Sequence, residues 1–232
     1  MLLSKSKQGK VSTLEAALQR IYDGCSLMYG GFGGIGTPPT IVEGILNKGC
    51  KDLSLIGNDA GFPDVGVGRL VSSGRVKKLI TSHIGSNPIA GQLMNKGEME
   101  VTFSPQGTLI ERIRAGGMGL GGILSDVGLA TVAEEGKTHI TVNGQEYLIE
   151  TALTAEVSII HASKADYLGN LVFEKSARNF NPLVAMAGDF TIVEADEIVQ
   201  VGELDPESII TPGIFVDMVI PSEGVNWKWV WE

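Results

Sequence analysis

The pattern of apolar and polar positions along the chain predicts strands that alternate with helices. Short apolar runs typical of buried strands occur at residues 26–29, 53–57, 79–82, 99–103, 157–161, 190–193 and 214–220. Apolar side chains recur at helical spacing in residues 13–22, after a Ser12–Glu15 capping box, and in residues 107–115. This alternation indicates an α/β fold, with an open, mostly parallel sheet flanked by helices.

The pattern changes in the second half of the chain. Residues 138–150 alternate around Asn143-Gly144, which is a strong signal for a β-hairpin with a primed turn. We therefore expect one domain over residues 1–232, with an antiparallel insertion at about 136–152. No internal repeat is evident.

A Trp-rich tail, residues 221–232, ends the chain. Trp227, Trp229 and Trp231 alternate with other residues, so an extended tail would place the three indoles on one face. That face packs either on the chain's own domain or on another chain.

A glycine-rich loop follows the first predicted strand. Gly31, Gly33 and Gly36 match the G-x-G-x-x-G of dinucleotide-binding loops, but this is weak in a chain with 31 glycines. A helix that began at Gly33 would carry two prolines in its second turn, at a cost of roughly 3 kcal/mol each. A helix capped by Thr37, with Pro38 as its first residue and Gly49 at its end, avoids that cost. The glycines therefore form a loop ahead of the helix, either a site whose N–H groups hold an anion or a tight turn without a ligand.

Composition and charge narrow the function classes. The formal net charge of the 232 residues is −9, which disfavours nucleic acids and anionic membranes as partners. No segment has the length and apolarity of a membrane span or a secretion signal. Cys25 and Cys50 fit no metal-ligand spacing and are interpreted as reduced thiols of a cytoplasmic protein. The three histidines are widely separated, so we expect no metal site: His83, His139 and His161.

Five segments closely resemble signature segments of the family I (3-oxoacid type) coenzyme A transferases, in the family's order. They are Asp-Gly-Cys-Ser-Leu-Met-Tyr-Gly-Gly-Phe-Gly-Gly-Ile-Gly-Thr-Pro (23–38), Ile-Gly-Asn-Asp-Ala (56–60), Ser-His-Ile-Gly-Ser-Asn-Pro (82–88), Ser-Pro-Gln-Gly-Thr-Leu-Ile-Glu-Arg-Ile-Arg-Ala-Gly-Gly (104–117) and Lys-Ser-Ala-Arg-Asn-Phe-Asn-Pro (175–182). Tyr29 is a small departure, since the family usually has an aliphatic residue or Phe there. The resemblance covers about residues 10–220 and is closest to the α subunit of bacterial acetate or butyrate–acetoacetate CoA-transferases. It implies the CoA-transferase (NagB-RpiA-like) fold.

The resemblance also implies a reaction and a partner. In this family a glutamate of a β subunit, in a Ser-Glu-Asn-Gly motif, attacks an acyl-CoA and then carries CoA as a thioester until a second acid accepts it. The nearest match here, Ser222-Glu223-Gly224, lacks the Asn. We therefore expect half an active site, which needs a β subunit, acyl-CoA and a short-chain carboxylic acid, with CoA as a substrate and no permanent cofactor.

Carried over by motif, two amides are the expected catalytic residues, Gln106 and Asn58, as donors to the oxyanion that forms on the thioester. The expected substrate-binding residues are those of the glycine loop and two glycines of a second glycine-rich segment: Gly30, Gly31, Phe32, Gly33, Gly34, Ile35, Gly36, Gly116 and Gly117. Structural roles compete with these: Asn58 could close a turn and Gln106 could cap a helix. Arg112 and Arg114 could pair with CoA phosphates or form salt bridges on a helix surface.

Two other function classes stay open at this point. Folds of this kind also hold phosphates on glycine loops, so a sugar-phosphate isomerase is an alternative. A non-catalytic ligand-sensing domain is another, although no basic element that could read DNA is evident.

Overall fold

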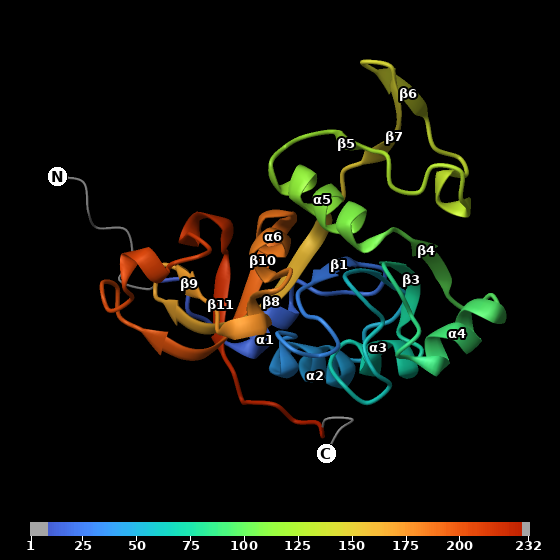
Figure 1. Cartoon of the computed structure of the whole chain (residues 1–232). Coiled ribbons are helices and arrows are strands. Elements are labelled where there is room, and N and C mark those ends of the chain that lie inside the picture. The colour runs from blue at the N-terminus through green and yellow to red at the C-terminus, as the bar shows by residue number, and fades with distance from the viewer. Residues whose placement is uncertain (1–8, 229–232) are drawn as a thin grey trace.

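An eight-stranded sheet forms the body of the molecule (Figure 1). The structure is a computed structural model that describes residues 9–228. The strands follow the order β11-β10-β8-β1-β2-β3-β4, with β9 beside β8. Their bounds are β1 Ser26–Tyr29, β2 Leu53–Ile56, β3 Val76–Thr81, β4 Glu100–Phe103, β8 Ala155–Asp166, β9 Leu171–Val172, β10 Gly188–Val199 and β11 Met218–Pro221. Neighbouring strands are parallel except β9, which is antiparallel to β8. The predicted α/β class is confirmed.

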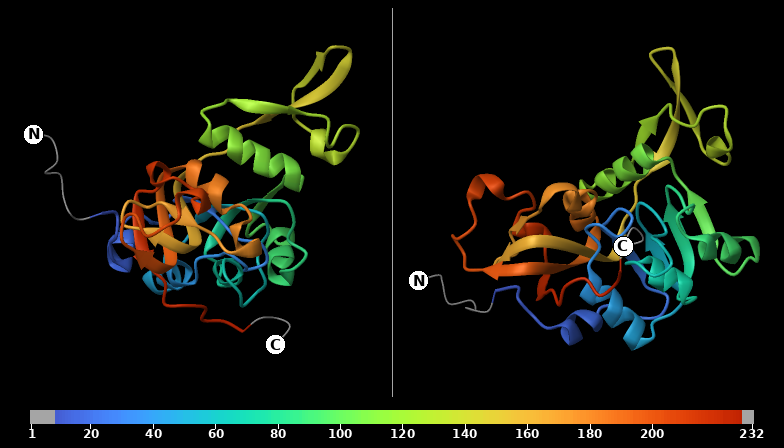
Figure 2. Two further views of the ribbon diagram at one scale, coloured as in Figure 1. Left: turned by 60° about the vertical axis from the view of Figure 1, so that its left-hand side comes forward. Right: turned by 60° about the horizontal axis from the view of Figure 1, so that its bottom comes forward.

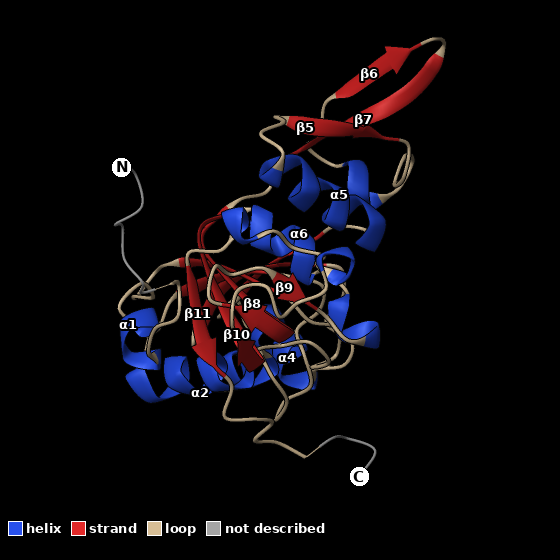
Figure 3. Ribbon diagram, turned by 90° about the vertical axis from the view of Figure 1, so that its left-hand side faces the viewer, coloured by secondary structure: helices blue, strands red, loops and turns tan. Residues whose placement is uncertain are grey.

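Helices cover both faces of this sheet (Figure 3). The residues of β1 alternate between the two faces: Leu27 and Tyr29 belong to one hydrophobic cluster, and Met28 belongs to another. Helices α1 to α4 pack on the first cluster, and helices α5 and α6 pack on the second. The bounds are α1 Leu14–Leu18, α2 Pro39–Lys48, α3 Gly68–Ser72, α4 Pro88–Asn95, α5 Gln106–Gly117 and α6 Asn181–Met186, with short 3₁₀ turns η1 Val132–Glu134, η2 Lys175–Arg178, η3 Pro206–Ser208 and η4 Gly213–Phe215.

A second, antiparallel sheet projects from the body beyond α5 (Figure 2). It contains β5 Gly122–Ser125, β6 His139–Val142 and β7 Gln145–Thr151, in the order β5-β7-β6. The predicted hairpin is present as β6 and β7, and its turn residues Asn143 and Gly144 have φ values of +51° and +80°. The insertion begins earlier than residue 136, because β5 pairs with β7.

Two predicted helix starts are shifted by one residue. Helix α1 is capped by Thr13, not Ser12, and it ends at Leu18 instead of residue 22. Helix α2 has Pro38 as its N-cap, not Thr37. The N–H of Thr37 donates to the carbonyl of Gly34 (3.3 Å), so Thr37 still belongs to the loop. Gly49 ends α2 with a left-handed φ of +81°, as predicted.

The start of the tail runs along helix α2. Ser222 Oγ donates to Glu194 Oε1 (2.6 Å), and the N–H of Glu223 donates to Thr40 Oγ1 (2.9 Å). Further along, Asn226 Nδ2 donates to Glu43 Oε2 (3.0 Å). Residues 222–228 form no strand. Trp229 and Trp231 lie outside the described residues, so the predicted common face of the three indoles stays a prediction.

The structure shows one short repeat that the sequence analysis missed. Residues 31–36 (Gly-Phe-Gly-Gly-Ile-Gly) follow β1, and residues 61–66 (Gly-Phe-Pro-Asp-Val-Gly) follow β2. Both segments form a tight turn closed by an antiparallel bridge, between Phe32 and Ile35 in the first turn and between Phe62 and Val65 in the second. The two turns lie next to each other at the carboxyl edge of the sheet, where ligands of open parallel sheets bind.

Candidate active site

Loops from the carboxyl ends of three strands meet at this edge. The first turn follows β1, Asn58 and Asp59 follow β2, and Gln106 opens helix α5 after β4. Buried apolar strands bring each loop to the same edge, because parallel strands all end on the same side of a sheet. The two amides that the resemblance selected, Asn58 and Gln106, are therefore brought together by the fold.

A continuous chain of hydrogen bonds joins these groups. Gln106 Nε2 donates to Asn58 Oδ1 (2.6 Å), and Asn58 Nδ2 donates to Asp59 Oδ2 (2.7 Å). The same Asp59 oxygen accepts the N–H of Gly33 in the first turn (2.9 Å). Asp59 Oδ1 accepts the N–H of Gly61 at the start of the second turn (2.8 Å). The chain fixes the orientation of both amides relative to the first turn.

The two amides differ in accessibility. The side chain of Asn58 is fully buried (0% exposed), whereas Gln106 is an exposed residue. An amide nitrogen has two hydrogens, so Gln106 Nε2 can donate one to Asn58 and a second one outward. This geometry favours Gln106 as the group that meets a substrate and Asn58 as the group that holds Gln106 in place.

Asp59 was not among the residues selected from the sequence. It is 3% exposed, and its two oxygens together accept three N–H groups, so it is not available as a nucleophile. The signal that could have identified it is its position: an acidic residue directly after a buried strand and next to a candidate donor.

Tyr29, the small departure from the family pattern, lies beneath this cluster. Its hydroxyl donates to the backbone carbonyl of Asp59 (2.5 Å), and its ring is buried. Burial, with a smaller contribution from the Asp59 charge, raises the pKa of Tyr29 well above its ordinary value, so the phenol stays neutral. Gly57 leaves room for the ring, because a Cβ there would lie 2.3 Å from Tyr29 Cζ.

Two asparagines of the 175–182 segment hold the glycine loop from its other side. Asn179 Oδ1 accepts the N–H of Gly31 (3.0 Å), and Asn179 Nδ2 donates to the carbonyl of Ile35 (2.9 Å). Asn181 Nδ2 donates to the carbonyl of Gly36 (2.9 Å). The loop is therefore held between Asp59 on one flank and these two amides on the other.

Most backbone donors of the glycine loop are already used inside the protein. The N–H groups that donate to protein acceptors are those of Gly30, Gly31, Phe32, Gly33 and Ile35. What the loop presents outward is apolar: Phe32 is 48% exposed and Ile35 is 36% exposed. With Ser176 and Asn179 these two side chains line a cavity of about 190 Å³.

Gly116 and Gly117 lie elsewhere. They form the last turn of α5, not a loop. Gln106 is the first residue of the same helix, so about 15 Å of helix separates Gln106 from the two glycines. A Cβ on Gly116 would lie 2.1 Å from the carbonyl oxygen of Leu153, and one on Gly117 would lie 2.6 Å from Met186 Cβ. Both glycines allow close packing of α5, and we leave them out of the proposed site.

The two arginines of helix α5 are paired within the protein. Arg112 Nε donates to the carbonyl of Thr151 (2.7 Å), and Arg114 NH2 lies 2.6 Å from Glu111 Oε2.

Within residues 9–228, no three His, Cys, Asp or Glu side chains gather closely enough to hold a metal ion. No helix in that range is long and apolar enough to cross a membrane.

The chain is similar to known proteins over most of its length. The family model described as coenzyme A transferase matches residues 11–222. The α subunit of a probable coenzyme A transferase of Bacillus subtilis is 56% identical over 96% of this chain and 98% of its own. The α subunit of the acetate CoA-transferase of Escherichia coli is 52% identical, over 92% of this chain and 97% of its own. The acetoacetyl-CoA:acetate/butyrate CoA transferase alpha subunit of Clostridium acetobutylicum is 46% identical, over 85% and 91%.

A solved structure has the same fold. The crystal structure of an acyl-CoA transferase from E. coli O157:H7, in a thioester complex with CoA, superposes with a TM-score of 0.81 at 23% identity. The match covers 93% of this chain, which spans about half (47%) of that longer chain.

Proposed function

The chain belongs to the coenzyme A transferase family, and we propose that it is the α subunit of a heteromeric enzyme that moves CoA between short-chain acids. The acids we propose are acetoacetate or butyrate on one side and acetate on the other, as in the names of two relatives. CoA is a substrate here, and no permanent cofactor is required. The family match does not favour the sugar-phosphate isomerase or the ligand-sensing alternative. The reduced, buried Cys25 and Cys50 suit a cytoplasmic enzyme.

The reaction begins with a nucleophile on the partner. The acyl carbonyl of the acyl-CoA is attacked by a glutamate carboxylate of the β subunit, the carbon–sulfur bond breaks, and CoA leaves as a thiolate. The product is an acyl-glutamyl anhydride. The thiolate then attacks the glutamyl carbonyl and releases the free acid, which leaves CoA on the glutamate as a thioester. A second acid runs the same steps in reverse and departs as its CoA ester.

This chain stabilises the charge that forms in each attack. Negative charge develops on the carbonyl oxygen, and a fixed amide donor lowers the energy of that state by about 3 kcal/mol. Gln106 Nε2 fits this role because Asn58 already fixes one of its hydrogens (2.6 Å) and leaves the other to point outward. A neutral amide also donates without competing as a nucleophile.

The observation that carries the proposal is the hydrogen-bonded chain from Gln106 through Asn58 and Asp59 to Gly33. It supplies an oriented donor next to an apolar loop, and the carboxylate within it is buried and already accepts three N–H groups. A site of this kind can stabilise an acyl transfer, but its nucleophile has to come from another chain.

Co-expression with a β chain that carries the Ser-Glu-Asn-Gly motif tests the division of roles. The purified complex should exchange isotopic label between butyryl-CoA and free acetate, and the α chain alone should not. Transfer by the α chain alone, or an acyl adduct on one of its carboxylates, would contradict the proposal.

Replacement of Gln106 tests the donor. In the complex, Gln106→Ala should lower kcat/KM by about a hundredfold or more, because one oxyanion donor is lost. It should also lower the free energy of unfolding by about 1 kcal/mol, because the buried Asn58 Oδ1 loses its donor. Gln200→Ala, at another exposed glutamine, is the matched control and should change kcat/KM less than about twofold. A loss of less than threefold in Gln106→Ala would remove Gln106 from the mechanism.

A further inference from the structure

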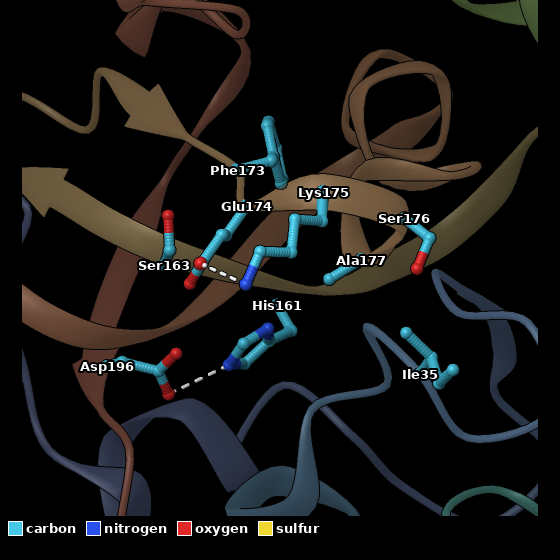
Figure 4. A pocket seen from close by; sticks show the side chains of 9 residues that line it. All are labelled: Ile35, His161, Ser163, Phe173, Glu174, Lys175, Ser176, Ala177 and Asp196. Atoms are coloured by element: carbon cyan, nitrogen blue, oxygen red, sulfur yellow. Dashed lines mark hydrogen bonds and ion pairs between the residues drawn. The ribbon is translucent and has the colours of Figure 1, made fainter.

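Most ion pairs within residues 9–228 lie at the surface of the molecule. Figure 4 shows two of them, His161–Asp196 and Lys175–Glu174, around a cavity of about 230 Å³ beside the glycine loop. The side chains of Asp196, Lys175 and Glu174 are all more than half exposed. Exposed pairs of this kind do little to fix the shape of a protein, because water competes for both partners.

A different kind of charged cluster lies between helix α5 and the second sheet. We call Lys137, Glu150 and Arg112 the ion triad. Glu150 Oε1 lies 2.5 Å from Lys137 Nζ, and Glu150 Oε2 lies 3.9 Å from Arg112 Nε. The side chains of Glu150 and Arg112 are only 2% and 12% exposed. Burial lowers the pKa of Arg112, and the charge of Glu150 opposes this change.

A buried ion triad is a poor source of stability compared with an apolar contact. Taking charges out of water costs free energy that their pairing only partly offsets, so apolar side chains of similar size often stabilise a protein more. Buried charges can instead fix a geometry, because a displacement leaves a charge without its partner. The backbone is joined at the same point, since the N–H of Leu153 donates to the carbonyl of Arg112 (3.0 Å). The ion triad therefore fixes how α5 lies against the end of β7.

Arg112 contacts more than Glu150. Its Nε donates to the carbonyl of Thr151 (2.7 Å), and its NH2 donates to the hydroxyl of the same residue (3.4 Å). Its NH1 donates to Ser104 Oγ (3.5 Å), two residues before Gln106. Arg112 is nearly buried and all three of its side-chain nitrogens already have acceptors, which argues against a role in binding the phosphates of CoA.

The contact with Ser104 matters because the first turn of α5 has no side-chain cap. Pro105 is the N-cap residue, and it makes no side-chain hydrogen bond to the helix. The N–H of Ser104 donates to the carbonyl of Thr81 at the end of β3 (3.0 Å), and its hydroxyl accepts from Arg112. Gln106 follows directly, so the backbone that leads into it is held by these two contacts.

We propose that Arg112 is a positioning residue for Gln106 and that the ion triad holds Arg112 in place. Arg112 lies six residues further along α5, about 9 Å along the helix axis, so it acts through Ser104 and not by contact with Gln106. Without Arg112 the first turn of α5 would shift, and the amide of Gln106 would no longer point at the oxyanion. This inference rests on the proposed function, in which Gln106 is the oxyanion donor.

The test measures kcat and KM separately in the α/β complex, by label exchange between butyryl-CoA and acetate. Arg112→Met keeps the length of the side chain and leaves Glu150 paired with Lys137, so the variant should fold. We expect kcat to fall about tenfold and the KM for butyryl-CoA to change less than about twofold. A displaced donor raises the energy of the transition state and leaves substrate binding unchanged.

Ser104→Ala is a second variant, which removes only the hydroxyl that Arg112 contacts. It should lower kcat about threefold without a change in KM, and it decides the question if Arg112→Met does not fold. An unchanged kcat in the variant that folds would overturn the inference. A rise in the KM for butyryl-CoA alone would also overturn it, because Arg112 would then bind substrate.

A double variant separates positioning from a general structural role. In a complex that already carries Gln106→Ala, Arg112→Met should lower kcat by less than about twofold, because no donor remains to be displaced. A loss of the same factor with and without Gln106 would overturn the inference.

Arg114→Met is the matched control, because Arg114 lies on the same helix, is partly exposed and pairs with Glu111. It should leave kcat within about twofold of the unmodified complex. If Arg114→Met lowered kcat as much as Arg112→Met does, the effect would not be specific to Arg112, and the inference would be wrong.

Failure of the proposed function can be told apart from failure of this inference. If the unmodified complex transfers no CoA, the proposed function is wrong. The inference is then tested by NMR on the same complex with nitrogen-15 glutamine, in which Gln106→Ala identifies the side-chain amide signal of Gln106. A shift of that signal in Arg112→Met but not in Arg114→Met would support the positioning of Gln106 by Arg112. A shift in both variants, or in neither, would refute it.

Discussion

The two turns after β1 and β2 share a pattern but differ in what they bury. In the first turn, Phe32 (48% exposed) and Ile35 (36% exposed) face outward. In the second turn, Val65 is 1% exposed, and a Cβ placed on Gly33 of the first turn would lie 3.5 Å from the ring of Phe62. The second turn therefore lies beneath the first and supports it.

Backbone conformation at the centre of each turn matches this difference. Gly33 and Gly34 have φ values of +56° and +94°, whereas Pro63 and Asp64 are not in the left-handed region. Glycine adopts such a pair of conformations without strain, and most other residues do not. The turn with two glycines at its centre is the one whose flanking side chains, Phe32 and Ile35, are exposed. The comparison shows that a repeated loop can serve once as buried support and once as an exposed apolar surface.

The largest effect should come from the final glycine of the first turn. A Cβ on Gly36 (φ +76°) would lie 2.4 Å from the carbonyl oxygen of Ala177, so Gly36→Ala must displace the loop. We expect a loss of about 3 kcal/mol in unfolding free energy and a loss of activity of about a hundredfold or more. Urea unfolding and label exchange measure the two effects.

Two glycines act as controls for this substitution. The equivalent Gly66 (φ +54°) would place a Cβ 3.0 Å from the Thr37 methyl group, which can shift more easily than a backbone. Gly74 (φ +68°) has open space around it, so Gly74→Ala should cost only about 1 kcal/mol, from backbone strain. If Gly36→Ala lowers the free energy of unfolding no more than Gly74→Ala does, close packing of the 175–182 segment against the glycine loop is not essential.

The next effect concerns the residue that joins the two turns. Asp59→Ala would leave the N–H groups of Gly33 and Gly61 and one amide hydrogen of Asn58 without their acceptor. We expect a loss of about 3 kcal/mol in unfolding free energy, because each buried donor without a partner costs roughly 1–3 kcal/mol. Amide hydrogen exchange should accelerate at Gly33 and at Gly61.

Asp64→Ala is the matched control, because Asp64 is an exposed carboxylate in the second turn. It should change stability by less than about 0.5 kcal/mol. Exchange that accelerates at only one of the two glycines in Asp59→Ala would show that Asp59 does not couple the turns.

The third prediction separates support from binding. Phe62→Ala should lower the unfolding free energy by about 2 kcal/mol, because a partly buried ring is lost beneath the first turn. Phe32→Ala should leave stability within about 0.5 kcal/mol but lower kcat/KM for butyryl-CoA about tenfold, since it removes apolar surface from the glycine loop. Calorimetry measures the stability of both variants, and steady-state kinetics measures their kcat/KM. We expect the loss of stability in Phe62→Ala and the loss of kcat/KM in Phe32→Ala. Equal kinetic losses in the two variants would contradict the division of roles.

Much of the fold could be predicted from the sequence. Strand β1 and the end of α2 at Gly49 follow from local patterns, namely an apolar run and a left-handed glycine. Helix α4 was missed although Asn87 caps it and Pro88 is its first residue, both of which are local signals. Helix α3 could not be found from such patterns. Helix α3 has only five residues and begins at Gly68 without a side-chain cap, so no periodic signal marks it. Strand β5 is set by its pairing with β7, which is a long-range contact.

The resemblance selected two residues that the structure brings together, but it selected neither Asp59 nor the hydrogen bonds that join the three side chains. Gln106 and Asn58 came from the family resemblance, and the structure brings them within hydrogen-bond distance (2.6 Å). Neither their unequal burial nor the role of Asp59 could be inferred, because both depend on how loops 48 positions apart along the chain meet. The pattern shared by the two turns was readable, since Gly-Phe-x-x-(Ile/Val)-Gly occurs twice within 40 residues, and a search for short repeats at strand ends would find it.

The smallest effect distinguishes the helices that follow the two turns. Helix α2 begins at Pro39 without a cap of its own, and the buried Glu194 of β10 replaces the cap by accepting from Thr40 Oγ1 (2.8 Å) and the N–H of Ile41 (3.1 Å). No equivalent group is required at α3, which follows the supporting turn. Burial raises the pKa of Glu194 despite these hydrogen bonds, so the folded protein favours its protonated form. The stability that this group contributes is therefore complete below its unfolded pKa, about 4.3, and is lost as the pH rises through its folded pKa. Urea unfolding should be measured for the unmodified protein and for Glu194→Gln from about pH 4 to pH 7. As the pH rises, the unfolding free energy of the unmodified protein should fall steadily relative to that of Glu194→Gln. If this difference in unfolding free energy stayed constant, or shifted in favour of the unmodified protein, the Glu194 carboxylate would not be destabilised by burial. Helix α2 would then not depend on a buried acid at its N-terminus, and in this respect it would not differ from α3.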